Sequence, residues 1–290
     1  MTPAASPPTP PPAPPPAPPP DPVFLATAVE IVLRAGAIQE AGRVSGFQIA
    51  KKGEIDLVTE VDLACERMCR EVLAERFPEH DILAEELSAG PGEAARARYR
   101  WVFDPLDGTT NYAHGLPIFC ASLALELDGQ AIAGAIYDPS RRELFTAELG
   151  QGSFLNGMPL KASAASALGD ALLVTGFPYD MHVRGPELVE LFGLFLGRAR
   201  AVRRLGSAAL DLCYVAAGRF DGFWEQHLKP WDVAAGALVV SEAGGRITGM
   251  DGAPFDARAG HLVASNGHVH GAMLDVIGGS RASRTLHGTG

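Results

Sequence analysis

The chain has 290 residues, 47% of them hydrophobic and 20% charged, so it is long enough to bury a sizeable core in one large domain or two modest ones. Its formal net charge of -10 argues against a grip on the nucleic-acid backbone, and we expect no bulk nucleic-acid binding. If the substrate is itself an anion, cations or aligned backbone N–H groups must lie between it and the acidic side chains of the protein. This requirement is an early indication of a metal site.

The two ends of the chain differ in composition from the rest. Residues 1–22 are rich in proline and predict a polyproline-like or disordered tail, either an inert extension or a docking segment for a proline-binding partner. We also expect a flexible tail at 281–290. The N-terminus lacks the basic and apolar regions of a signal peptide, and no uninterrupted apolar run reaches the roughly 18 residues that span a bilayer. We therefore expect a cytoplasmic protein without a membrane segment.

Two helices are predicted near the N-terminus. Asp21 is a suitable N-cap and Pro22 a suitable first residue for an amphipathic helix that runs to Gly42. Thr59 and Asp62 have the spacing of a capping box and predict a second helix, which Pro78 ends. Four cysteines without zinc-site spacing are predicted to be reduced core residues: Cys65, Cys69, Cys120 and Cys213.

The middle of the chain predicts an antiparallel sheet, because turn residues separate several of its strand-like segments. These segments are 81–85, 100–104, 118–127, 131–138 and 142–148. Further along, the pattern predicts a strand at 170–176, helices near 186–200 and 207–218, a short strand at 219–225 and an apolar helix from Pro230 to Ala243. Strands with intervening helices indicate a layered α/β architecture.

Acidic residues follow two of the predicted strands. Asp104 ends one strand and Asp107 comes three residues later, across a turn that Pro105 enforces, while Glu85 ends an earlier apolar strand. Taken alone, each of these is more often an ordinary turn or a solvated strand end. Their recurrence is what indicates a site.

One more acidic residue lies at the start of a helix that is apolar nearly all round and must be buried. Asp232 occupies its first turn, where a carboxylate can simply cap free N–H groups. No Lys or Arg follows within the next turn to pair with it, and a metal would satisfy this charge. Ligands that are all oxygen suit Mg²⁺, and two such ions support phosphoryl transfer to water. The N–H groups after Asp107, at Gly108 and Thr109, can face a phosphate.

Seven ordered segments resemble motifs of the inositol monophosphatase family, and the resemblance covers residues 23 to about 280. Residues 104–111 (DPLDGTTN) are similar to its first signature, and residues 231–236 (WDVAAG) with 242–245 (EAGG) to its second. The other segments are 56–62, 84–86, 150–157, 175–178 and 206–211, and segments 203–207 and 228–232 look like the bacterial branch. The resemblance implies an α/β fold, a layered αβαβα sandwich, with two halves at about 23–180 and 181–280.

The resemblance also implies the ligands of two magnesium ions. One would be bound by Glu85, Asp104 and the backbone carbonyl of Leu106, and the other by Asp104, Asp107 and Asp232. A weaker third ion would be shared by Glu85 and waters.

Further roles are implied for residues around these ions. Thr109 with Asp62 would orient the attacking water, although Asp62 has the alternative of only closing its capping box. Lys51, near the metals in the family, is either a surface charge or a support for the acidic cluster. In the substrate site, Glu225 would accept a hydrogen bond from a hydroxyl of the leaving alcohol, beside a wall formed by Gly206, Ser207 and Ala208.

The predicted activity is magnesium-dependent hydrolysis of a phosphate monoester, inositol monophosphate or a similar polyol phosphate, by metal-activated water. The resemblance implies inhibition by lithium and a homodimer. The same chemistry on fructose 1,6-bisphosphate, histidinol phosphate or a nucleotide bisphosphate is the enzymatic alternative. A regulatory or binding protein that keeps the fold without activity is the alternative from another class.

Overall fold

A computed structural model describes residues 20–51, 57–87, 97–178 and 181–280 of the chain. The predicted tails at 1–22 and 281–290 lie outside the described residues except for positions 20–22, and Pro22 already begins the first helix.

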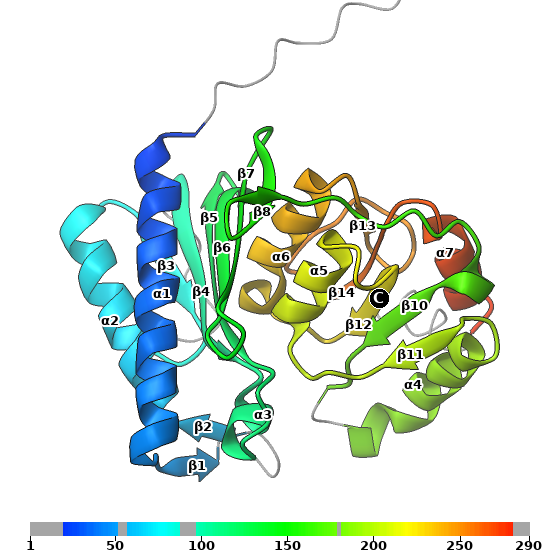
Figure 1. Cartoon of the computed structure of the whole chain (residues 1–290), viewed down its shortest axis with the longest axis horizontal. Coiled ribbons are helices and arrows are strands. Elements are labelled where there is room, and N and C mark those ends of the chain that lie inside the picture. Colours follow the sequence, from blue (N-terminus) through cyan, green and yellow to red (C-terminus); the bar gives the residue numbers. More distant parts are fainter. Residues whose placement is uncertain (1–19, 52–56, 88–96, 179–180, 281–290) are drawn as a thin grey trace, which may run out of the picture.

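The described residues form five layers that alternate between helices and sheets (Figure 1). Helices α1 (Pro22–Ser45) and α2 (Glu60–Arg76) pack together against one face of a large sheet. Helices α5 (Ala208–Ala216) and α6 (Pro230–Glu242) lie between this sheet and a second one, whose outer side carries α4 (Met181–Leu196) and α7 (His270–Gly278). The predicted αβαβα sandwich is thereby confirmed.

Within the described residues, the large sheet has seven strands in chain order from β3 to β9. They are β3 (Asp81–Ala84), β4 (Tyr99–Asp107), β5 (Cys120–Leu127), β6 (Gln130–Asp138), β7 (Glu143–Glu148), β8 (Gly152–Leu155) and β9 (Met158–Pro159). The expectation of a wholly antiparallel sheet is wrong at one edge, because β3 pairs with β4 in parallel. A parallel pair cannot be joined by a tight hairpin, so the turn signals that predict antiparallel neighbours do not apply to it.

The second sheet, again counted among the described residues, has five strands in the order β11-β10-β12-β14-β13. They are β10 (Leu172–Thr175), β11 (Ala201–Arg203), β12 (Gly222–Gln226), β13 (Arg246–Thr248) and β14 (His261–Ser265). The sheets divide between β9 and β10, so the predicted first half, to about residue 180, includes a strand of the second sheet. The remaining elements are the hairpin β1 (Ile49–Lys51) and β2 (Leu57–Thr59), the short helix α3 (Thr109–Ala113) and a 3-10 turn at Leu168–Asp170.

Both N-terminal helices begin at the predicted caps. The Asp21 side chain accepts from the Val23 N–H at 3.0 Å, and the capping box of Thr59 and Asp62 is present in full. Helix α1 has 24 residues and is long and apolar enough to cross a membrane by length and composition alone. It packs on β5 and β6 and buries Ile31 and Val32 there, as a core helix does.

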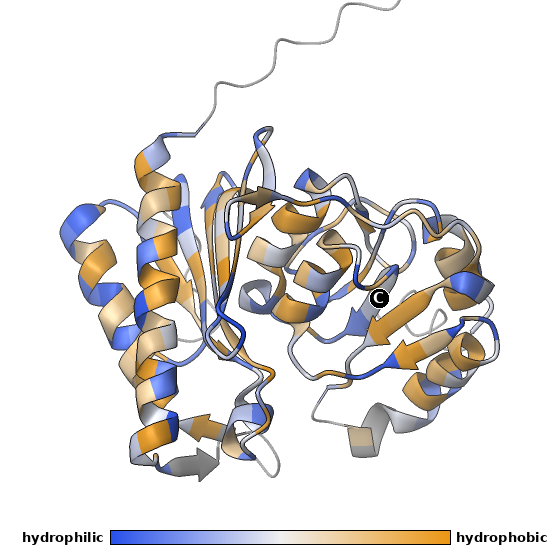
Figure 2. Ribbon diagram, viewed as in Figure 1, coloured by the Kyte–Doolittle hydropathy of each residue, from blue (hydrophilic) through white to orange (hydrophobic). Residues whose placement is uncertain are grey.

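Hydrophobic residues recur along the helices and strands (Figure 2), and the buried ones form the core clusters that hold the layers together. Helix α6 contacts α5 and strands of both sheets, and eight consecutive residues from Val233 to Val240 are buried. The four cysteines are buried and free, which confirms their predicted role in the core.

Candidate active site

A cavity of about 370 Å³ lies where the ends of β4 and β12 meet the starts of α5 and α6. Most of the predicted site residues line it, and they come from segments far apart in the sequence. The set comprises Glu85, Asp104, Leu106, Asp107, Gly108, Thr109, Gly206, Ser207, Ala208, Glu225 and Asp232. Asp62 lies behind this lining. Lys51 belongs to β1, but its side chain is outside the described part of the chain.

The end of β4 carries two acids on the cavity side. Asp104 pairs with Ser122 of β5 and Asp107 with Cys120, so three steps on β4 match two on β5. Pro105, which has no N–H to donate, lies in this irregular stretch. The Asp104 carboxylate accepts from the Leu106 N–H at 2.9 Å, which closes the turn.

Asp107 joins the strand end to the start of α5. One of its carboxylate oxygens accepts from the Ser207 hydroxyl and from the Ala209 N–H, both at 2.7 Å. The free N–H groups at a helix start favour such a carboxylate. Sequence reasoning placed Ser207 in the substrate wall, and the structure also gives it this bond to Asp107.

The other two acids reach the cavity from β3 and α6. Glu85 directly follows β3 and is half-buried. The Asp232 carboxylate accepts a hydrogen bond from the Lys229 N–H at 2.7 Å and caps α6. The capping role that the sequence allows for this residue is therefore present in the structure. Asp232 also lines the cavity, and the second oxygen of a carboxylate leaves room for another partner.

Burial and mutual repulsion raise the pKa values of the acids in the cavity. Burial raises the pKa of Asp104 well above its usual range, and the charges of Glu85, Asp107 and Asp232 add to the effect. Burial and then the charge of Asp107 raise the pKa of Asp232 to about 7. A cation between these groups would remove the repulsion.

Among the described residues, no group of three His, Cys, Asp or Glu side chains stands ready to hold a metal ion. Asp107 and Asp232 each turn a carboxylate oxygen toward a backbone N–H group. The donor set is nonetheless all oxygen and carries excess negative charge, which fits a hard divalent cation.

Thr109 lies at the start of α3 between the strand end and α2. Its hydroxyl is 2.9 Å from the Leu106 carbonyl and 3.3 Å from an Asp62 oxygen, and its one hydrogen can be donated to only one of them. The other Asp62 oxygen accepts from the Thr59 N–H at 2.9 Å. Asp62 therefore closes the capping box and faces Thr109 as well, so both interpretations of this residue fit its geometry.

Glu225 also lines the cavity, near the end of β12. Burial raises its pKa to about 8, with repulsion from Asp232 the next cause. A Cβ atom at position 176 would lie 2.1 Å from a Glu225 oxygen, so this position must be glycine while Glu225 keeps its place. Sequence reasoning noted the segment 175–178 without assigning Gly176 a role.

The loop before α5 depends on two glycines and on Asn111. Gly108 and Gly206 have φ values of 95° and 89°, a region that L side chains rarely adopt. The Asn111 amide donates to the carbonyls of Ile118 at 2.9 Å and Leu205 at 2.8 Å, and so ties α3 to this loop. The asparagine that ends the first signature is thus a positioning residue that sequence reasoning left without a role.

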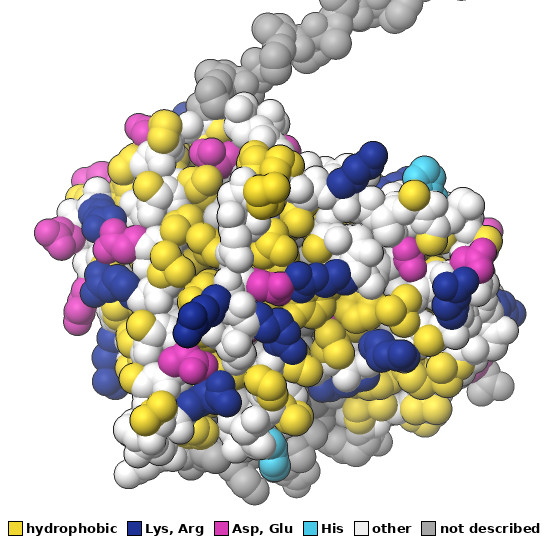
Figure 3. Space-filling model, in the orientation of Figure 1, with side chains coloured by type: hydrophobic (Ala, Val, Ile, Leu, Met, Phe, Trp, Pro, Cys, Tyr) yellow, Lys and Arg dark blue, Asp and Glu magenta, His cyan; other side chains and the backbone are white. Residues whose placement is uncertain are grey.

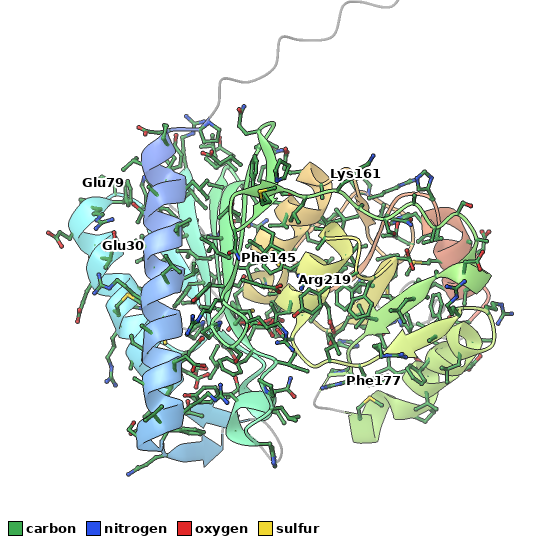
Figure 4. The ribbon with its side chains drawn as sticks, in the orientation of Figure 1. Glu30, Glu79, Phe145, Lys161, Phe177 and Arg219 are labelled. Atoms are coloured by element: carbon green, nitrogen blue, oxygen red, sulfur yellow. The ribbon has the colours of Figure 1, made fainter. Side chains whose placement is uncertain are left out.

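Other lining residues were also missed. Arg204 and Lys229 line the cavity and are exposed. Phe177 (labelled in Figure 4) lines it too, and the centroid of its ring lies 5.7 Å from that of Phe192 on α4. On the face shown in Figure 3, basic and acidic side chains are interspersed, without a broad field of one sign. Tandem arginines before a glycine were the available signal for Arg204.

Comparison with known proteins identifies the class. The profile of the inositol monophosphatase family matches residues 22–281, so the chain belongs to this family of phosphatases. It is 42% identical over 259 residues to an inositol-1-monophosphatase of Rhizobium meliloti, with 87% of this chain and 95% of the relative covered. It is 43% identical over 227 residues to the Nus factor SuhB of Escherichia coli K12, with 78% and 84% covered.

A solved structure agrees with the fold. The inositol monophosphatase of Anabaena superposes with a TM-score of 0.79 at 40% identity, with 88% of this chain and 95% of that chain covered.

Proposed function

We propose that this chain hydrolyses the phosphate ester of inositol monophosphate, or of a similar polyol monophosphate, to the free alcohol and phosphate. The observation that carries the proposal is that Glu85, Asp104, Asp107 and Asp232, from three separate parts of the chain, line one cavity together with Glu225. The relatives named as inositol-1-monophosphatases support the same substrate class.

The cavity would take Mg²⁺, as two ions with a weaker third in the family pattern. Glu85, Asp104, the Leu106 carbonyl, Asp107 and Asp232 would hold them, as the all-oxygen donor set and its excess negative charge favour. Bound there, the cations would neutralise substrate phosphate and activate water for attack at phosphorus.

The chain's own residues then have distinct tasks. Thr109, held between Leu106 and Asp62, would orient the attacking water through its hydroxyl. The N–H groups of Gly108 and Thr109 would donate to the phosphate oxygens as charge develops on them. Glu225 would accept a hydrogen bond from a hydroxyl of the leaving alcohol, beside Gly206 and Ala208.

The decisive assay is phosphate release by the purified full chain with Mg²⁺, with and without Li⁺. The panel holds inositol monophosphates, fructose 1,6-bisphosphate, histidinol phosphate and adenosine bisphosphate. Highest kcat/KM on inositol monophosphate with inhibition by Li⁺ is the expected result. A clear preference for another member of the panel would replace the substrate and leave the chemistry in place.

A variant tests the acidic cluster. Asp107→Asn should lower kcat/KM by about 10³-fold, because it removes one of the charges that a cation needs. Asp275→Asn, the same change at an exposed site on α7, is the matched control and should leave turnover unchanged. Near-normal turnover of Asp107→Asn with an intact fold would contradict the metal assignment.

A regulatory or binding role is the second candidate, favoured by the relatives named Nus factor SuhB. Silence of the wild-type chain across the whole panel would support it over catalysis. A homodimer, a cytoplasmic location and the absence of bulk nucleic-acid binding complete the proposal. Sedimentation of the purified chain would test the first of these.

A further inference from the structure

Glu66 is a charged side chain in the interior of the first layer. It lies on α2, is 0% exposed, and its oxygens accept from the backbone N–H groups of Glu86 at 2.7 Å and Leu87 at 2.9 Å. These donors lie 20 and 21 residues further along the chain. Glu66 therefore fixes a remote backbone segment.

Arg70 completes the charge balance of this group. Its side chain, which is 30% exposed, meets a Glu66 oxygen at 2.8 Å one helical turn away. In a surface ion pair the carboxylate stays in contact with water. The Glu66 carboxylate is instead desolvated and accepts hydrogen bonds from three separate groups. Burial of a carboxylate costs free energy, so the arrangement is stable only while those donors stay in place.

The segment that Glu66 holds begins at the candidate active site. Glu85 directly precedes the two donor residues and follows Ala84, which pairs with Phe103 next to Asp104. The charge of Glu85 acts on Asp104 across the cavity edge. On α2 itself, Glu66 lies one turn after Asp62, which faces Thr109. One helix face therefore supports two parts of the cavity.

We propose that Glu66 is a positioning residue for Glu85, which fixes the strand end that carries Glu85 and so sets the affinity of the cavity for Mg²⁺. The inference rests on the proposed function, in which Glu85 is one of the groups that hold the cation. Sequence reasoning gave Glu66 no role, because its partners follow the next strand rather than its own helix.

The test compares three variants of the full chain with the wild type. Glu66→Gln keeps the size of the side chain but leaves one acceptor oxygen, so at least one of the two N–H groups loses its partner. Glu71→Gln is the matched control, the same change at an exposed site on α2. Arg70→Met removes the charge partner and leaves the carboxylate, and serves if Glu66→Gln does not fold.

Two measurements report on the cation and one on the backbone. Phosphate release is followed over a range of Mg²⁺ concentrations, Mg²⁺ binding is measured by calorimetry without substrate, and amide exchange is followed at Glu86 and Leu87. Glu66→Gln should raise the Kd for Mg²⁺ about 10- to 100-fold and speed exchange of the two amides, with kcat at saturating Mg²⁺ and KM changed less than about threefold. Arg70→Met should shift the Kd in the same direction by less.

The outcomes separate this proposal from the proposed function. If exchange at the two amides accelerates while the Kd for Mg²⁺ stays within about twofold of wild type, Glu66 does not set the affinity and the proposal is overturned. An unchanged Kd in Arg70→Met overturns it where Glu66→Gln does not fold. If the wild type binds Mg²⁺ but releases no phosphate, the proposed function fails while the calorimetric comparison still decides the role of Glu66.

Discussion

Gly176 shows how a residue without a side chain shapes the substrate site. An added Cβ at this position would meet the Glu225 carboxylate, as described above, so Gly176→Ala must displace that group. We expect KM for inositol monophosphate to rise about tenfold, with a smaller change in kcat, because in the proposed function the displaced group binds the leaving alcohol and not the phosphate. Steady-state kinetics check this.

Gly193→Ala is the matched control for that change. Gly193 is exposed on α4, and an added Cβ there meets nothing within 4 Å. This variant should keep wild-type KM and gain about 0.5–1 kcal/mol of stability from the better helix propensity of alanine. An unchanged KM in Gly176→Ala as well would show that Glu225 does not bind the alcohol.

Asp211 is a buried carboxyl whose titration should make the stability of the fold depend on pH. It is buried on α5, neither of its oxygens has a hydrogen-bond partner among the described residues, and burial raises its pKa well above its usual range. A raised carboxyl pKa in the folded chain means that stability is highest below the unfolded pKa, about 4, and is lost as the pH rises through the folded value.

Asp211→Asn should remove this loss, because an amide of similar shape carries no charge. We expect the variant to melt at least about 2 °C above wild type at pH 8, and the gain to shrink as the pH falls toward 4. Melting curves across that range check this. A gain that is constant with pH would mean that the Asp211 carboxyl does not titrate in the window.

The site residues differ in how far the sequence alone could predict them. Glu85, Asp104 and Asp232 carry local signals, because each lies at the end of an apolar strand or the start of an apolar helix. Asn111 and Glu66 act on backbone groups up to 94 and 21 residues away, so nothing in their own neighbourhood reveals the partner. The local sequence pattern therefore predicts the acidic residues but not the residues that position the backbone around them.

Among the elements, α6 links the cavity to a distant turn. Its N-terminal end carries Asp232, and near its C-terminal end Glu242 accepts from the N–H groups of Gly150 and Gly152, both at 2.8 Å. Glu242→Ala leaves both N–H groups to water, and we expect a loss of about 1–2 kcal/mol in the free energy of unfolding with kcat unchanged. Chemical denaturation measures the loss.

Glu242→Gln is the graded control, because it keeps one acceptor oxygen. Its loss should be about half as large. Equal stability of the alanine variant and the wild type would mean that this contact does not hold the turn.

Elements with strong local signals were predicted, and several of the shortest ones were not. The first two helices and α6 have caps, long apolar patterns or both, and they start at the expected residues. Strands β9 and β13 have only two and three residues, too few for an alternating pattern to show. The parallel pairing of β3 with β4 was missed because it depends on a crossover, which no local pattern encodes.

For the whole molecule, the acidic cavity predicts that a cation stabilises the fold. Without one, buried carboxylates repel each other across the cavity. A ligand that binds only the folded chain adds about 2.7 kcal/mol at 100 times its Kd, so saturating Mg²⁺ should raise Tm by several degrees over EDTA. Calorimetry measures the shift.

Asp232→Asn should reduce that Mg²⁺-dependent shift, because one of the groups that would hold the cation loses its charge. The shift should persist in Asp275→Asn, whose side chain is exposed on α7. The same Mg²⁺ effect in all three proteins would place the cation elsewhere.

The irregular pairing near Pro105 also decides which mutations in β4 the site can survive. Successive side chains of a strand alternate between its two faces, so residues three apart normally face opposite ways. The extra residue between Asp104 and Asp107 restores the parity and lets both acids face the cavity. A single-residue deletion or insertion there would keep both acids on the cavity side only if β4 also returned to regular pairing with β5, and would otherwise turn one acid into the opposite layer. Point substitutions and single-residue length changes at this strand end should therefore differ sharply in how often they leave a working enzyme.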